Sequence, residues 1–119
     1  MRRKIGTLVP LEVAILEAST ELRRAGQVEV HGYELAKVVR DLRQARRLTA
    51  YGTLYKALAR LEREGFLASR WEDPMAAADE GRPRRRFYRL TLEGENALNA
   101  ARAEARDKAA GRPAAASVL

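Results

Sequence analysis

Two short segments of the chain concentrate its positive charge, and both carry side chains that bind phosphate. The first segment, YGTLYKALARLEREG at residues 51–65, contains Lys56, Arg60 and Arg63. The second, RPRRRFYR at residues 82–89, contains five arginines and no acidic residue. Arginine suits phosphate because its planar guanidinium group presents several donors in a fixed fork. The two segments therefore predict binding to a polyanion, with nucleic acid as the leading candidate.

The residues that catalysis and metal binding require are scarce in this sequence. There is no cysteine, and His31 is the only histidine. The sequence has no glycine-rich phosphate loop, and its carboxylates lack the spacing of catalytic or metal-binding motifs. We therefore expect a protein that is not an enzyme and that holds no cofactor and no metal.

Length and composition bound the fold and the compartment. With 119 residues, of which 46% are hydrophobic, the chain is expected to form one globular domain with a net charge of +7. It lacks an apolar run long enough to cross a membrane, and the basic start MRRKIG is not followed by the apolar region of a signal peptide. We therefore expect no membrane association and a cytoplasmic location.

Hydrophobic spacing predicts three helices before the second basic segment. The first covers residues 9–25, the second begins near Gly32, and the third covers residues 51–65. Gly26 and Gly65 suit the C-terminal ends of the first and third helices, because glycine adopts the left-handed conformation that often ends a helix.

The third helix has an apolar side and a basic side. At about 100° per residue, its leucines fall within one narrow arc, formed by Leu54, Leu58 and Leu61. Lys56 and Arg63 point the opposite way, with Thr53 and Arg60 on the flank, and Thr49 suits the N-cap. A helix held by its leucines can present its other side to a DNA major groove, where residues near its N-terminus reach base edges.

Two strands and a last helix are predicted for the remainder. FLASRWED and RRRFYRLT have the composition of β-strands, and PMAAADEGRP between them has the Pro and Gly of a hairpin loop. On the second strand, alternation places Tyr88 and Leu90 inward. Thr91 suits the N-cap of a helix that ends near residue 110, with a mostly alanine apolar face.

This order of elements predicts a mainly α fold with a small β-hairpin, arranged as a winged helix-turn-helix. The winged-helix DNA-binding domain is expected at residues 1–90, including the N-terminal helix at 8–26. A C-terminal dimerisation helix is expected at 91–110, because a second copy is the simplest cover for its alanine face. Residues 111–119 are expected to be a flexible tail.

Several of these side chains also have a purely structural interpretation. The cations of the third helix match a solvated helix face, and charge on an edge strand deters aggregation. His31 is favoured as a cap or packing residue over a pH sensor. Tyr33 is expected in the core from its helical spacing. Tyr55 fits a core ring and a hydroxyl bonded to phosphate equally well.

The sequence resembles the PadR family of bacterial transcriptional regulators. The resemblance rests on HGYELAKVV, GTLYKALARLEREGFL and GRPRRRFYRLTLEGENAL, which occur in family order and cover most of residues 31–98. It implies a winged-helix dimer that represses promoters by binding palindromic operators, with dimer contacts from the first and last helices. The resemblance also matches Thr53, Tyr55 and Lys56 to DNA-facing positions of the third helix, and Arg84 and Arg85 to the basic wing.

We therefore predict a homodimeric, sequence-specific regulator that binds double-stranded DNA at a pseudo-palindromic operator and acts as a repressor. The predicted DNA contacts are Tyr51, Thr53, Tyr55, Lys56, Arg60, Arg84, Arg85 and Arg86. Three alternatives remain open: a regulator that responds to a small-molecule effector at the dimer cleft, a module that binds an acidic protein partner, and an architectural protein that binds DNA without sequence preference.

Overall fold

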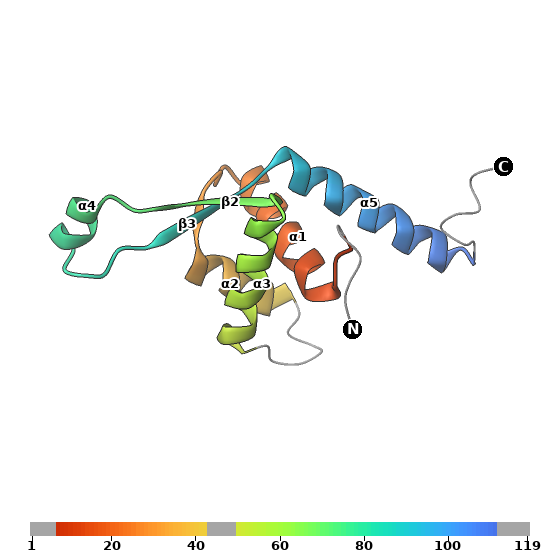
Figure 1. Ribbon diagram of the computed structural model, residues 1–119, viewed down its shortest axis with the longest axis horizontal. Coiled ribbons are helices and arrows are strands. Elements are labelled where there is room, and N and C mark those ends of the chain that lie inside the picture. Colours follow the sequence, from red (N-terminus) through yellow and green to blue (C-terminus); the bar gives the residue numbers. More distant parts are fainter. Residues whose placement is uncertain (1–6, 43–49, 112–119) are drawn as a thin grey trace.

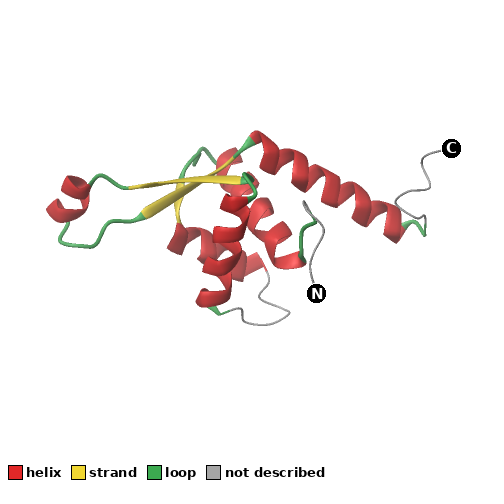
Figure 2. Ribbon diagram, in the orientation of Figure 1, coloured by secondary structure: helices red, strands yellow, loops and turns green. Residues whose placement is uncertain are grey.

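The computed structural model describes residues 7–42 and 50–111, which form five helices and three strands (Figures 1 and 2). The elements follow one another as α1 (Pro10–Arg24), β1 (Val30–His31), α2 (Gly32–Leu42), α3 (Tyr51–Arg63), β2 (Leu67–Trp71), α4 (Pro74–Asp79), β3 (Arg86–Leu90) and α5 (Leu92–Ala109). The predicted order of elements is therefore present, with β1 and α4 in addition.

The three strands form one antiparallel sheet in the order β1-β3-β2. On the central strand β3, Tyr88 lies opposite Val30 of β1 and opposite Ser69 of β2. The side chains of Tyr88 and Leu90 are buried whereas that of Arg89 is exposed, which confirms the predicted alternation. β1 has only two residues, too few to show the alternation by which a strand is found in a sequence.

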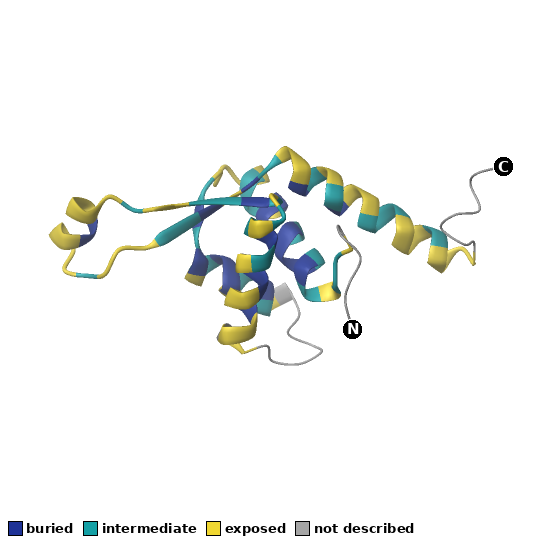
Figure 3. Cartoon of the chain, viewed as in Figure 1, coloured by how far each residue is buried: buried dark blue, intermediate teal, exposed yellow. Residues whose placement is uncertain are grey.

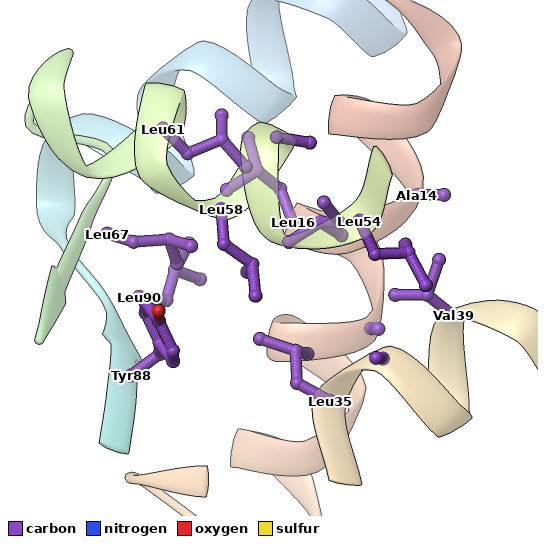
Figure 4. Packing of buried hydrophobic residues seen from close by; sticks show 14 of the residues in the cluster. Ala14, Leu16, Leu35, Val39, Leu54, Leu58, Leu61, Leu67, Tyr88 and Leu90 are labelled. Atoms are coloured by element: carbon purple, nitrogen blue, oxygen red, sulfur yellow. The ribbon is translucent and has the colours of Figure 1, made fainter. Parts of the chain in front are cut away.

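The core lies where α1, α2 and α3 pack against one another and against the sheet (Figure 4). Full burial of a valine, leucine or isoleucine side chain contributes about 1.5–3 kcal/mol to stability, so several such residues fix the orientation of each helix. The largest fully buried apolar side chains are Ile15, Leu16, Leu35, Val39, Leu54, Leu58, Leu61, Leu67 and Leu98.

Both ends of α1 carry local signals that explain its bounds. Pro10 occupies the first turn, and the backbone N–H of Val9 donates to Oε1 of Glu12 at 3.0 Å. Gly26 follows the helix with a φ of 97°, a conformation that glycine adopts without steric cost. The predicted end of the first helix is confirmed.

The ends of α3 and α5 meet at Thr91. α3 begins after Ala50, which occupies the N-cap position, while the predicted N-cap, Thr49, lies outside the described residues. Gly65 follows α3 with a φ of 81°, as predicted. The hydroxyl of Thr91 donates to the carbonyl of Gly65 at 2.6 Å and accepts from the N–H of Gly94 at 3.0 Å. Thr91 is thus the N-cap of α5, as predicted, and joins it to the end of α3.

The segment predicted as a hairpin loop, residues 74–83, lies between the paired strands β2 and β3, and it contains the short helix α4, which the prediction did not include. Asp73 caps this helix by accepting from the N–H of Met75 at 3.0 Å, and Pro74 occupies its first turn. Asp at the N-cap followed by Pro is a favourable helix start. We call residues 67–90, which comprise β2, α4, β3 and the segments that connect them, the wing. Six residues are too few for helical periodicity to reveal such an element.

The wing and α5 leave the body of the molecule in opposite directions (Figure 1). α5 is joined to α1 by two ion pairs, between Arg23 and Glu95 at 2.9 Å and between Arg102 and Glu17 at 3.6 Å. The predicted flexible tail lies, after Gly111, outside the described residues. None of the helices in residues 7–42 and 50–111 combines the length and the hydropathy that a membrane span requires.

The expectation that Tyr33 belongs to the core is wrong. The residue is 59% exposed. α2 buries an arc that contains Leu35, Ala36 and Val39, and Tyr33 lies outside this arc on the helix circumference. The ring therefore stands at the surface near the N-terminus of α2, where it lines the candidate site.

Candidate nucleic-acid interface

The leucine face of α3 fixes which side chains this helix presents to solvent (Figure 3). Leu54, Leu58 and Leu61 are fully buried, as the spacing predicts. Thr53 and Lys56 are exposed on the other side. The structure gives Lys56 no hydrogen bond or ion pair within the described residues, so its ammonium group is available to a partner.

Arg60 occupies a different environment from Lys56. Its Nη1 atom lies 3.1 Å from Oε1 of Glu12, and its Nη2 atom donates to the carbonyl of Thr7 at 3.3 Å. The Arg60 side chain is 16% exposed and that of Glu12 only 2%. Arg60 therefore pairs with a buried carboxylate and links α3 to α1, and most of its side chain is covered.

Tyr55 stands beside the N-terminus of α2. A Cβ atom added at Gly32 would lie 3.0 Å from Cε1 of Tyr55, so the missing side chain of Gly32 makes room for this ring. Tyr55 as a residue remains 41% exposed. The ring is therefore packed on one side and open on the other. Tyr51, the remaining predicted site residue of α3, has a side chain outside the described part of the structure.

The wing arginines fall into two groups. Arg82 donates to both carboxylate oxygens of Glu72, at 2.6 and 2.8 Å, and lowers the pKa of Glu72 to about 2. Arg86 donates to Glu62 at 3.1 Å and to Ser69 at 3.0 Å. These two arginines are held by carboxylates within the protein. In the described residues, no hydrogen bond or ion pair is made by the side chains of Arg84, Arg85 and Arg89.

The pairing of Arg86 with Glu62 has a second consequence. Glu62 lies in the last turns of α3, and its Oε2 atom also accepts from the Ser69 hydroxyl at 2.6 Å. The three side chains come from α3, β2 and β3, so they fix the wing relative to α3. This cluster joins the two basic segments of the sequence, residues 51–65 and 82–89. The sequence of either segment by itself does not reveal the contact.

A hollow of about 390 Å³ lies where α2, α3 and the wing meet. It brings together the exposed tyrosines and the wing arginines, so the predicted site residues Tyr55, Arg84, Arg85 and Arg86 share one surface. Aromatic rings with guanidinium groups beside them are a common means of contacting nucleic-acid backbones. The side chains that line it belong to His31, Gly32, Tyr33, Tyr55, Trp71, Arg84, Arg85 and Arg86.

His31 closes the hollow from the sheet side. Its Nδ1 atom accepts from the backbone N–H of Glu34 at 3.2 Å, which caps the start of α2 as predicted. Burial, followed by the positive charge of Arg85, lowers the pKa of His31 below its usual value of 6.5. The neutral form is therefore favoured, and this form keeps Nδ1 able to accept the hydrogen bond.

Two residues of the site were not found from the sequence. Trp71 lines the hollow because the sheet register places it opposite Arg86, and a register cannot be read from one strand alone. The second residue is Tyr33, which the sequence analysis predicts in the core. Tyr33 lies two residues after His31, in the first turn of α2, and this position was the sequence feature that could have indicated a surface role. Among the described residues, no group of His, Asp or Glu side chains is arranged to hold a metal ion.

Comparison with known proteins agrees with this geometry. Residues 22–100 match the model of the transcriptional regulator PadR-like family. A transcriptional regulator from Clostridium thermocellum is 26% identical over 85% of this chain and 84% of its own, with a TM-score of 0.65. A PadR family transcription regulator from Clostridium difficile is 26% identical over 85% of this chain and 92% of its own, with a TM-score of 0.64.

A third structure shares the fold alone. Bacillus subtilis PadR, solved in complex with operator DNA, is 22% identical over 78% of this chain and 46% of its own, with a TM-score of 0.58. No curated protein matches the chain in sequence. The family match spans well over half of the chain, and the winged-helix fold and the basic hollow are those expected of a regulator rather than an enzyme. The chain belongs to the PadR family of transcriptional regulators.

Proposed function

We propose that this regulator is a homodimer that binds a pseudo-palindromic DNA site and represses transcription by occluding the promoter. The observation that carries the proposal is the hollow in which Tyr55 of α3 meets Arg84 and Arg85, whose side chains make no hydrogen bond or ion pair with the residues that the structure describes. In the proposed complex, Tyr55 from α3 and the two arginines from the wing contact the same DNA duplex. The complex of Bacillus subtilis PadR with operator DNA, a protein of the same fold, supports this role for the winged helix.

In the proposed complex α3 enters the major groove, with Thr53 and Lys56 near base edges and Tyr55 at the sugar-phosphate backbone. Arg84 and Arg85 then contact flanking phosphates or the minor groove. Arg60 and Arg86 are left out of direct contact, since buried or half-buried carboxylates already neutralise them. Their role is to hold α3 and the wing in position.

We place the dimer interface at a groove of about 870 Å³ between α1 and α5. Alanines line its α5 side, at positions 97, 100, 101 and 105, and Val13 and Leu8 of the α1 segment line the other. Small side chains permit close helix packing. Two successive half-sites require a dimer whose two copies of α3 lie about 34–36 Å apart, or a multiple of that distance.

The DNA-binding arm of the proposal is tested by selecting bound fragments from genomic DNA and measuring affinity over a salt series. Lys56→Ala is expected to change the selected sequence. Arg85→Ala is expected to weaken all duplexes alike and to reduce the slope of log K against log salt by about 1. Arg24→Ala, at an exposed position at the end of α1, serves as the control of equal charge change. Unchanged affinity and selectivity in both variants would show that the site is assigned wrongly.

The dimer arm is tested by light scattering of Ala101→Glu, which places a charge in the groove. A shift from dimer to monomer is expected, because a desolvated, unpaired carboxylate opposes association. Ala103→Glu makes the same substitution on the other side of α5, outside the groove, and should remain dimeric. A parent protein that is monomeric at all concentrations would contradict this part of the proposal.

A further inference from the structure

Trp71, the only tryptophan of the chain, stands at the end of β2, and the residue is 52% exposed. Two arginines lie over its ring. The guanidinium carbon of Arg84 is 5.3 Å from the ring centroid, and that of Arg86 is 5.1 Å away. Arg86 is the residue directly opposite Trp71 in the β2–β3 pairing. These distances are those of cation–π contacts, for which tryptophan offers the most favourable ring.

The two arginines depend on this ring to different degrees. Arg86 is also held by Glu62 and Ser69. Arg84 has no hydrogen bond or ion pair in the described part of the chain, so the indole face is the one polar interaction that the structure assigns to its side chain. An arginine without a partner samples many rotamers, and fixing it on binding costs side-chain entropy.

The exposure of Trp71 also needs a reason. A large aromatic ring that is half exposed contributes little burial to the core, and a charged or polar residue would satisfy an edge strand equally well. The ring lines the hollow between α2, α3 and the wing, beside the arginines. Its position fits a role at this surface rather than in the fold.

We propose that Trp71 is a positioning residue for DNA binding: its ring holds the Arg84 guanidinium group beside the hollow before DNA arrives, so that a backbone phosphate meets an ordered donor. This inference rests on the proposed function. It adds Trp71 to the site as a residue that affects DNA binding through Arg84. Arg84 makes the phosphate contact, and Trp71 reduces the entropy that Arg84 loses when it does so.

A double-mutant cycle on the full chain tests this relation, with a duplex of about three helical turns that carries a fragment selected by the parent protein. Trp71→Leu retains apolar bulk but removes the π face, and it is expected to weaken binding about two- to fivefold. In an Arg84→Ala background the same substitution should have no further effect, because Trp71 acts through Arg84. Trp71→Phe, which keeps a weaker π face, should restore part of the loss.

Arg85 provides the matched control. It is the neighbouring arginine and lines the same hollow, but the structure places no ring contact on it. Trp71→Leu and Arg85→Ala are therefore expected to be additive in free energy. If Trp71→Leu weakens binding as much in the Arg84→Ala background as in the parent, Trp71 contacts DNA by itself and the inference is wrong.

A second measurement reports on the contact without DNA. Because Trp71 is the only tryptophan, the tryptophan bands in near-ultraviolet circular dichroism and fluorescence of the free protein report on this residue. Arg84→Ala should change this tryptophan signal, whereas Arg85→Ala should leave it close to that of the parent. An unchanged signal in Arg84→Ala overturns the inference. A parent that binds no duplex overturns the proposed function as well. If the parent binds DNA and the effects of Trp71→Leu and Arg84→Ala are additive, only the role of Trp71 is overturned.

Discussion

Arg60 of α3 and Glu12 of α1 form an ion pair with a 3.1 Å separation between Nη1 and Oε1, in which the carboxylate is almost fully buried. Glu12 also accepts from the N–H of Val9, so one carboxylate caps α1 and anchors α3. The orientation of the helix that we assign to the major groove therefore depends on a charge inside the protein.

Glu12→Gln is expected to lower the free energy of unfolding by about 2–3 kcal/mol, because it leaves the charge of Arg60 without its partner in a largely buried site. This loss of stability is smaller than for a fully buried ion pair because the Arg60 side chain is 16% exposed to solvent. Urea unfolding measures it. Arg63→Ala, an exposed change on the same helix, should stay within about 0.5 kcal/mol of the parent. An equal stability of Glu12→Gln and the parent would show that the pair does not anchor α3.

Gly94→Ala is expected to prevent cooperative folding or to cost at least about 3 kcal/mol. A Cβ atom at this position would overlap the carbonyl oxygen of Phe66 and crowd Leu90. The backbone of α5 would have to move away from the end of α3, and the Thr91 cap would be lost with it. Thermal unfolding followed by circular dichroism measures the effect. A variant that melts like the parent would contradict the close approach of α5 at this point.

Gly52→Ala is expected to leave the fold intact, or to stabilise it by up to about 1 kcal/mol, and yet to weaken DNA binding about tenfold. A Cβ atom at Gly52 would meet nothing within 4 Å, and the residue needs no left-handed conformation. Among the described residues, nothing thus requires glycine there, next to Thr53 on the exposed side of α3. In the proposed complex, close approach of DNA would require it. Melting temperature and duplex affinity are measured together, and unchanged affinity would show that DNA does not approach this turn.

Stability is expected to fall as the pH drops below about 6.5, through the titration of His31. Its pKa is lowered in the folded protein, by burial first and then by Arg85. The unfolded chain therefore binds the proton more readily, so this contribution is complete above the unfolded pKa and is lost as pH falls through the folded pKa. The carboxylates of Glu29, Glu72 and Glu95 have lowered pKa values and titrate at more acidic pH.

His31→Asn provides the control for this pH dependence. The Asn side chain can still accept at the start of α2 but does not titrate. Urea midpoints measured at about pH 7.5 and 5.5 should differ in the parent and converge in the variant. The same difference in both proteins would assign the effect to another group.

Local sequence was sufficient for the elements that position the site. The spacing of Leu54, Leu58 and Leu61 predicts both the existence of α3 and its buried side, because helical periodicity is a property of neighbouring residues. Gly65 and Thr91 mark element ends for the same reason, since their effects on backbone conformation are local. Tyr33 shows the limit of this reasoning. Helical spacing was used to predict a core position for Tyr33, but α2 buries the arc that contains Leu35, Ala36 and Val39, and Tyr33 lies outside this arc.

What the sequence determined by itself is the order of elements and the presence of two basic segments. What only the tertiary structure decided is which of those charges remain free. Arg60 is neutralised by a carboxylate of α1, Arg86 by one of α3, while Arg84 rests on the ring of Trp71. Each partner is distant in the chain or set by strand register. Net charge counts side chains, but their availability depends on contacts that form only when the elements pack.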